Sequence, residues 1–131
     1  MKTILFQGDS ITDADRSYSD DNKRGLGYPQ LVTARLGYDA AGEYNFINRG
    51  ISGNRIVDVY ARIKKDIINI NPDIMSILIG VNDVWHEINY NNGVETEKFE
   101  NGADKDVNCY SEYITTQEFI SVRAVTFCQA V

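Results

Sequence analysis

The stretch ILFQGDS, residues 4–10, joins an apolar run to a glycine, an aspartate and a serine. Residues 3–7 are expected to form a short buried strand, after which Gly8 lets the backbone turn sharply. Ser10 would then emerge at the carboxyl end of that strand, the edge of an α/β sheet where ligands bind. Taken alone the signal is weak, because Gly, Asp and Ser are ordinary turn residues. Its meaning depends on the segments at the ends of two later strands.

The chain after this stretch alternates helical and strand patterns. A polar loop is expected at 11–27. The further elements expected are a helix opened by Tyr28-Pro29 and ended by Gly37 as a left-handed cap, a strand at 44–48, a helix at 56–70, a strand at 73–80 and a helix from about Val94. Strands that alternate with helices predict an α/β fold, in which helices cover both faces of a parallel sheet.

Length and charge narrow the class of protein. A chain of 131 residues fits one domain, and its net charge of −6 argues against a nucleic-acid partner, which would need a basic face. No stretch approaches the roughly 20 apolar residues of a membrane span, so no membrane partner is expected. The first apolar run is too short for a signal peptide, and the two late cysteines imply no disulfide framework. A cytoplasmic location is the expectation.

The composition changes near residue 102. All ten glycines and both prolines lie within residues 1–102, whereas both cysteines, Cys109 and Cys128, lie after it. Residues 103–131 also show no clear helical or strand period. The sequence therefore predicts two parts, an organised portion at 1–102 and a divergent tail at 103–131.

The three expected strands end in segments with complementary chemistry, at residues 8–10, 48–54 and 80–83. In a parallel sheet these ends share one edge. Acyl transfer needs a nucleophile there, together with donors aimed at the oxyanion that develops on the attacked carbonyl. Ser10 offers a hydroxyl and its own N–H, Gly53 an unshielded N–H, and Asn82 a neutral amide donor.

At these residues the chain resembles the SGNH hydrolases, also called the GDSL esterase/lipase family. Gly8-Asp9-Ser10 matches the first family block, Gly53 the second, and residues 80–83 the third; the resemblance covers residues 1 to about 100. It implies Ser10 as the nucleophile, with an oxyanion hole formed by Ser10 N–H, Gly53 N–H and the Asn82 side chain. It also implies a flavodoxin-like three-layer α/β/α fold, a small-molecule ester substrate, and no metal or organic cofactor.

The chain departs from the family at the general base. The family's fourth block is an Asp-x-x-His near the C-terminus, and this chain has no histidine after His86. We therefore expect a fragment with an unrelated ending, or a frame-shifted or mispredicted product, whose sheet is incomplete at the C-terminus. The leading interpretation is a serine ester hydrolase for a small acyl or carbohydrate ester. The alternatives are a non-catalytic protein of the same family and a flavodoxin-like ligand-binding domain.

Other polar residues are interpreted as supporting groups. His86 lies after the third block on the same segment, so a structural or substrate-contact role is favoured over that of the base. Asp9 is interpreted as a turn residue that accepts hydrogen bonds from nearby backbone, and Asp83 as structural. Asp13-Ala14-Asp15 lacks the glycine and glutamate of a calcium loop, so no metal site is predicted. The charged residues of the loop at 11–27 are expected to form a solvated surface.

Overall fold

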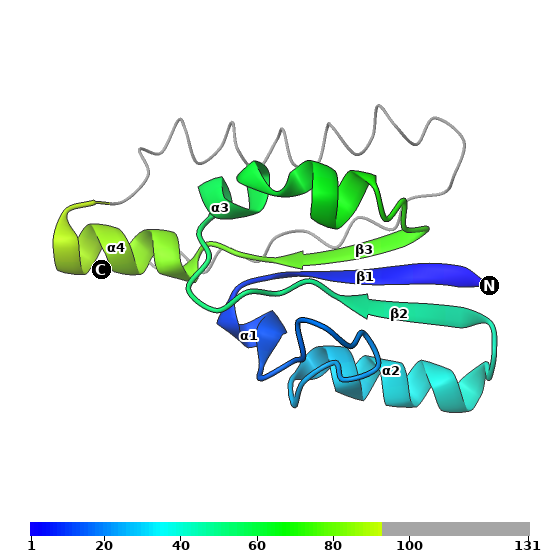
Figure 1. The fold of residues 1–131 in the computed structure, drawn as a ribbon. Coiled ribbons are helices and arrows are strands. Elements are labelled where there is room, and N and C mark those ends of the chain that lie inside the picture. The colour runs from blue at the N-terminus through cyan, green and yellow to red at the C-terminus, as the bar shows by residue number, and fades with distance from the viewer. Residues whose placement is uncertain (93–131) are drawn as a thin grey trace.

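A sheet of three parallel strands forms the centre of the computed structural model, which describes residues 1–92 (Figure 1). The strands are β1 (Lys2–Gly8), β2 (Tyr44–Asn48) and β3 (Ile74–Leu78), in the order β2-β1-β3. In the register, Ile4 of β1 lies opposite Phe46 of β2 and Ile74 of β3. Because β1 is the central strand and packs against helices on both faces of the sheet, its residues from Ile4 onward are buried, as its apolar run predicts.

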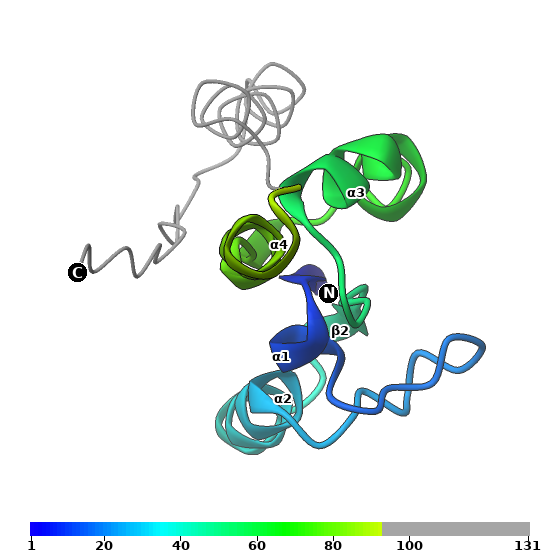
Figure 2. The same cartoon turned by 90° about the vertical axis from the view of Figure 1, so that its left-hand side faces the viewer.

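Helices lie on both faces of the sheet (Figures 1 and 2). One face carries α1 (Ser10–Asp13) and α2 (Tyr28–Asp39), and the other carries α3 (Ile56–Ala61) followed by the π-helical turn η1 (Lys64–Ile68). The helix α4 (Val81–Tyr90) leaves the carboxyl end of β3. None of the helices within residues 1–92 is long and apolar enough to cross a membrane.

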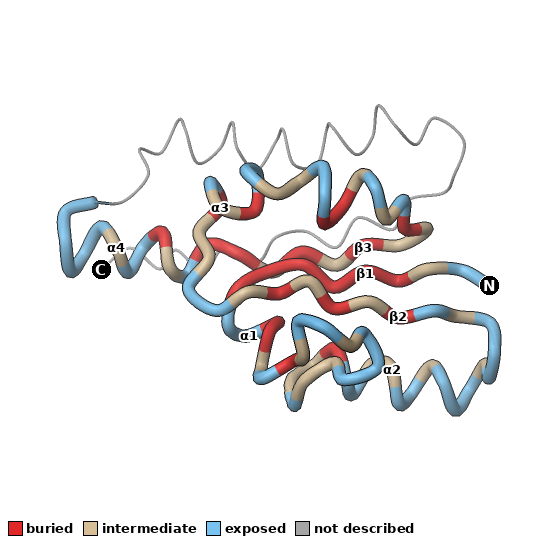
Figure 3. Tube along the Cα trace, in the orientation of Figure 1, coloured by how far each residue is buried: buried red, intermediate tan, exposed pale blue. Residues whose placement is uncertain are grey.

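Alternate residues of β1 supply two separate cores. Figure 3 shows that β1 is buried along most of its length. Leu5 points toward α3 and η1, whereas Ile4 and Phe6 point toward α2. The first core contains Leu5, Ile56, Val59, Ile67, Met75, Ile77 and Ile79, and the second contains Ile4, Phe6 and Phe46 packed against Tyr28, Val32 and Leu36. The helix expected at 56–70 therefore does contribute to the core.

The α/β class with a parallel sheet is confirmed. The order β2-β1-β3 also agrees with the first three strands of the flavodoxin-like order 2-1-3-4-5. That finer description, and the incompleteness of the sheet, stay predictions. The helix expected from Val94, the tail at 103–131 and the boundary at 102 lie outside the described residues.

Two helix predictions are wrong in detail. Gly37 does not end α2, which continues to Asp39 and is closed by a bond from Ala40 N–H to the Leu36 carbonyl. Space beside Gly37 is open, and a helix tolerates one exposed glycine at a cost of about 1 kcal/mol. The helix at 56–70 is divided into α3 and η1. The apolar spacing does not reveal the division, because apolar residues on both sides of it, among them Ile56, Val59 and Ile67, pack on the same core.

The loop at 11–27 also differs from expectation. It begins with a helical turn, α1, and two of its charged residues are not solvated: Asp13 is 4% exposed and Arg16 is 9% exposed. Hydrogen bonds to the backbone of the loop after β2 compensate for their burial: Asp13 accepts from Ser52 N–H, and Arg16 donates to the Gly50 carbonyl. Asn48 holds the same loop, since its Nδ2 donates to the carbonyls of Thr12 at 2.7 Å and Arg24 at 2.8 Å.

Arg62 connects the strand ends. Its Nη1 donates to the Arg49 carbonyl at 2.8 Å and to Asp66 Oδ2 at 2.9 Å, and its Nη2 donates to Gln7 Oε1 at 2.8 Å. A longer bond from Nη2 reaches the Gly8 carbonyl at 3.4 Å, and Nε donates to Asn54 Oδ1 at 2.9 Å. All five guanidinium donors are thereby used. The side chains of Arg62 and Asp66 are only 14% and 11% exposed.

We expect Arg62→Met to lower the free energy of unfolding by about 3 kcal/mol, because it leaves Asp66 charged and unpaired in a nearly buried position. Urea unfolding of the two proteins measures this. The matched control is Arg35→Met on α2, whose ion pair with Asp39 is exposed, at 77% and 41%. That variant should lose no more than about 0.5 kcal/mol. Equal losses in the two variants would contradict a structural role for Arg62.

Candidate active site

Ser10 lies directly after β1, and close packing of β1 against β3 determines the backbone there. A Cβ at Gly8 would lie 2.2 Å from the Leu78 carbonyl oxygen, so no other residue fits without a backbone shift. The Asp9 carboxylate accepts a hydrogen bond from Ile11 N–H at 3.0 Å and so caps the turn α1. Burial raises the pKa of Asp9. Ser10 itself is exposed, and its N–H in the first turn has no acceptor within the helix.

Gly53 lies on the loop after β2. This loop, which we call the second loop, is joined to the end of β1 by a hydrogen bond from Ile51 N–H to the Gly8 carbonyl at 3.0 Å. Gly53 has a φ of +81°, a conformation that favours glycine, and the space beside it is open. Within residues 1–92 its N–H donates no hydrogen bond, so it is available to a ligand.

Asn82 and Asp83 attach the third strand end to the second loop. Asn82 Nδ2 donates to the Asn54 carbonyl at 2.9 Å, and both Asp83 carboxylate oxygens accept from Ile56 N–H, at 3.1 and 3.3 Å. We call these contacts the 82–83 clamp. An amide carries two N–H donors, so one on Asn82 is left for a ligand. Burial raises the pKa of Asp83, while the bond from Ile56 opposes that shift.

A cavity of about 300 Å³ opens beside Ser10. It is lined by Ser10, Ser52, Tyr18 and residues 13–16. The nucleophile expected from the sequence therefore shares a cavity with the loop that carries Gly53. Gly53 and Asn82 are not in this lining; the second loop connects them to it through Ser52 and Asn54.

Three residues of this cavity were not singled out as site residues from the sequence. Asp13 Oδ2 accepts from Ser52 N–H at 2.9 Å and from the Tyr18 hydroxyl at 2.5 Å. Arg16 Nε donates to the Gly50 carbonyl at 2.6 Å, and its guanidinium lies 4.2 Å from the centre of the Tyr18 ring. Burial lowers the pKa of Arg16, with nearby Asp13 opposing. The only signal was their position, three, six and eight residues after Ser10 in a loop rich in charge.

His86 lies on α4 and packs its ring against Tyr90, with the centroids 5.7 Å apart. Its Nδ1 is buried without a partner among residues 1–92, and no hydrogen bond joins it to Ser10. The described residues also bring no three His, Cys, Asp or Glu side chains together as a metal site would require.

Comparison with known proteins identifies relatives of this arrangement. The model of the GDSL-like lipase/acylhydrolase family matches residues 6–117. An acetylxylan esterase of Geobacillus stearothermophilus is 41% identical over 90 residues, which are 64% of this chain and 41% of that protein.

Solved structures agree. A Parabacteroides merdae protein described as a GDSL-like lipase has a TM-score of 0.82 and 34% identity, over 90% of this chain and 57% of that one. A structure of the acetyl xylan esterase of Geobacillus stearothermophilus has a TM-score of 0.81 and 30% identity, over 90% of this chain and 58% of that one.

The chain spans 41% of the length of the related esterase and under three fifths of the two solved chains. Because the family model covers most of the sequence, with Ser10, Gly53 and Asn82 all inside the match, the assignment rests on more than one motif. The chain belongs to the GDSL-like lipase/acylhydrolase family.

Proposed function

We propose that the protein is a serine ester hydrolase in which Ser10 attacks the acyl carbonyl. The observation that carries the proposal is that the exposed Ser10 shares a cavity with the loop bearing Gly53. In the attack, Ser10 Oγ bonds to the carbonyl carbon, the carbonyl oxygen becomes an oxyanion, and the hydroxyl proton passes to water. Collapse of the oxyanion then breaks the bond to the alcohol, which leaves with a proton, and a water molecule hydrolyses the acyl-serine to release the acid. The N–H groups of Ser10 and Gly53 and the free amide donor of Asn82 stabilise that charge.

The substrate we propose is a small acyl ester of a carbohydrate, such as an acetylated sugar. The similarity to an acetylxylan esterase supports this choice. The cavity supports it as well, because six of its seven lining residues carry polar or charged groups, which suit a hydroxylated ligand better than a long acyl chain. The cytoplasmic location and the lack of a nucleic-acid partner stay predictions.

A second candidate, ester binding without turnover, is favoured by the position of the histidine. Structures described as catalytic mutants of the Geobacillus esterase replace a serine, an aspartate or a histidine. His86 is the only histidine of this chain, and it packs on its own helix. A serine hydroxyl without a base is a poor nucleophile, so turnover by this chain decides between the two candidates.

Replacement of the nucleophile tests the proposal directly. Ser10→Ala should reduce hydrolysis of p-nitrophenyl acetate by about 10³-fold or more, because the attacking oxygen is removed. Initial rates of nitrophenolate release measure the effect. Ser19→Ala, which removes an exposed hydroxyl in the loop after α1, is the matched control and should keep full activity. Equal rates for the unmodified chain and Ser10→Ala would overturn the leading candidate in favour of binding alone.

The oxyanion hole has its own signature. Asn82→Ala should lower kcat by about 10²–10³-fold with little change in KM, because the donor acts on charge that develops only in the transition state. Steady-state kinetics with the same ester give both constants. Asn89→Ala, on the exposed part of α4, is the control. A rise in KM at constant kcat would assign Asn82 to ground-state binding instead.

The 82–83 clamp predicts a pH dependence of stability. Burial raises the pKa of Asp83 in the folded protein above its ordinary value of 3.8, so the folded state binds this proton more tightly than the unfolded state. The resulting stabilisation is complete below about pH 3.8 and is lost as the pH rises through the folded pKa. Relative to Asp83→Asn, the unmodified protein should therefore lose stability as the pH rises from about 3.5 through the raised pKa, as urea unfolding at successive pH values measures. A constant difference over this range would be the contrary result.

A further inference from the structure

A second cavity, of about 310 Å³, lies next to the one that contains Ser10. It is lined by Arg16, Tyr18, Arg49, Ile51, Lys65 and Asp66. Arg16 and Tyr18 line both cavities, so they form the shared wall. A ligand larger than one sugar, with its ester at Ser10, can therefore extend into the second cavity.

The walls of this cavity are positively charged, whereas the whole chain is negatively charged. They contain three cations and one carboxylate, in a protein whose net charge is −6. The carboxylate, Asp66, is already paired with Arg62 at 2.9 Å. Such a local reversal of sign concentrates anionic groups at the cavity.

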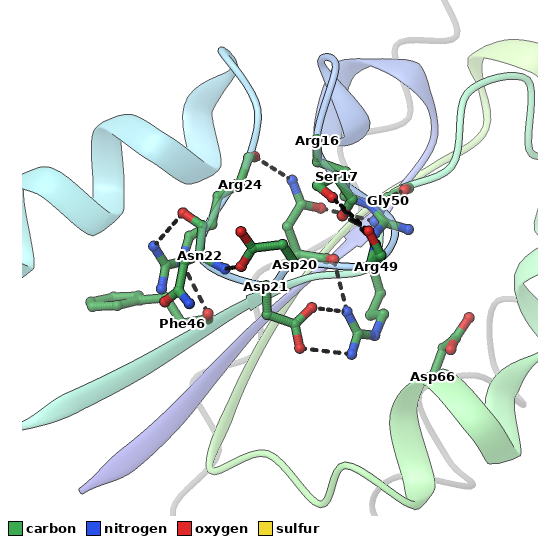
Figure 4. A network of polar contacts seen from close by, with 12 residues as sticks. Arg16, Ser17, Asp20, Asp21, Asn22, Arg24, Phe46, Arg49, Gly50 and Asp66 are labelled. Atoms are coloured by element: carbon green, nitrogen blue, oxygen red, sulfur yellow. Dashed lines mark hydrogen bonds and ion pairs between the residues drawn. The ribbon is translucent and has the colours of Figure 1, made fainter.

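Two of the cations keep free donors. Lys65 is exposed and forms no ion pair among residues 1–92, and Arg16 Nη2 donates no hydrogen bond there. The third cation, Arg49, is paired, since both of its terminal nitrogens donate to Asp21. Figure 4 shows Asp66 on the side of Arg49 away from Asp21. That pairing lowers the pKa of Asp21 and raises that of Arg49, so both stay charged.

The shared wall is fixed and has an apolar component. Arg16 Nε and Nη1 donate to the carbonyls of Gly50, at 2.6 Å, and Ser17, at 3.1 Å, so its guanidinium is positioned before a ligand arrives. The Tyr18 ring lies on that guanidinium and is still 65% exposed as a residue. Together with Ile51 it offers an apolar surface against which a sugar ring can pack.

We propose that this cavity, the cationic subsite, binds the carboxylate of a sugar acid joined to the esterified sugar. A carboxylate is planar and accepts in the directions that guanidinium and ammonium groups donate. The inference deepens the proposed function, on which the position of the ester at Ser10 rests. The substrate class is then an acylated oligosaccharide that carries an acidic residue.

Binding measurements test the subsite without requiring turnover. The 131-residue chain is titrated with methyl β-D-glucuronide, methyl β-D-glucoside and inorganic phosphate while backbone amide NMR signals are recorded. The glucuronide should bind at least about fivefold more tightly than the glucoside, as a charge-assisted hydrogen bond implies, and shift the signals of Arg16, Arg49 and Lys65. Its affinity should fall as NaCl is raised from about 20 to about 300 mM.

Two neighbouring lysines give a matched pair of variants. Lys65→Gln should weaken glucuronide binding by about threefold or more, because it removes the free ammonium group. Lys64→Gln removes the same charge from the adjacent exposed position, which does not line the cavity, and should leave the affinity unchanged. Unaltered dispersion of the amide spectrum confirms that both variants are folded.

Several results would overturn the subsite. These are equal affinity for glucuronide and glucoside, equal losses in the two lysine variants, or phosphate binding as tight as that of the glucuronide. Failure of the proposed function is a separate result, because it appears as the absence of Ser10-dependent hydrolysis with the glucuronide preference retained. Ser10-dependent hydrolysis without that preference would remove the subsite alone.

Discussion

The guanidinium of Arg62 lies where the carboxyl ends of β1 and β2 meet the second loop, and each of its five donors has an acceptor. Strand ends leave carbonyl groups without sheet partners, and a nearly buried cation is costly unless it is fully hydrogen-bonded. Arg62 offsets both costs, because it donates to carbonyls at the strand ends and all five of its own donors have acceptors. Because its acceptors include Gly8, Arg49 and Asn54, it fixes the starting points of two loops relative to each other.

The remaining loop contacts extend from this point. Asn82 and Asp83 bind the second loop at Asn54 and Ile56, and Asp13 binds it at Ser52. The loop that carries Gly53 is thus held on both sides of the glycine, whose own N–H donates no hydrogen bond within residues 1–92. An oxyanion hole requires donors that are already in place when the charge develops. Rigid neighbours around a free N–H are the arrangement that meets this requirement.

Much of the fold could be predicted from the sequence, and the reasons are local. The strand at 3–7 was visible because a strand covered on both faces reads as an apolar run. The burial of Asp13 and Arg16 was not visible, because it depends on Ser52 and Gly50, which are more than thirty residues away in the chain. Charged loop residues are usually solvated, and only tertiary contacts reverse that preference. The same holds for the candidate site. Ser10 could be predicted because it follows a strand, where residue type alone suggests chemistry. The 82–83 clamp and the cationic subsite could not, because they depend on which loops lie side by side.

Within residues 1–92, the contacts that hold the proposed nucleophile and oxyanion donors include those of Arg62 with Gln7, Asp13 with Ser52, and Asp83 with Ile56. None of these contacts requires the group that, under the proposed function, removes the proton from Ser10. In serine hydrolases an oxyanion hole and substrate binding alone retain about 10³–10⁴-fold acceleration over water when a triad member is removed. A base adds to this only if it reaches a serine that is already correctly placed. Under the proposed function, the described residues supply that placement before any proton transfer takes place.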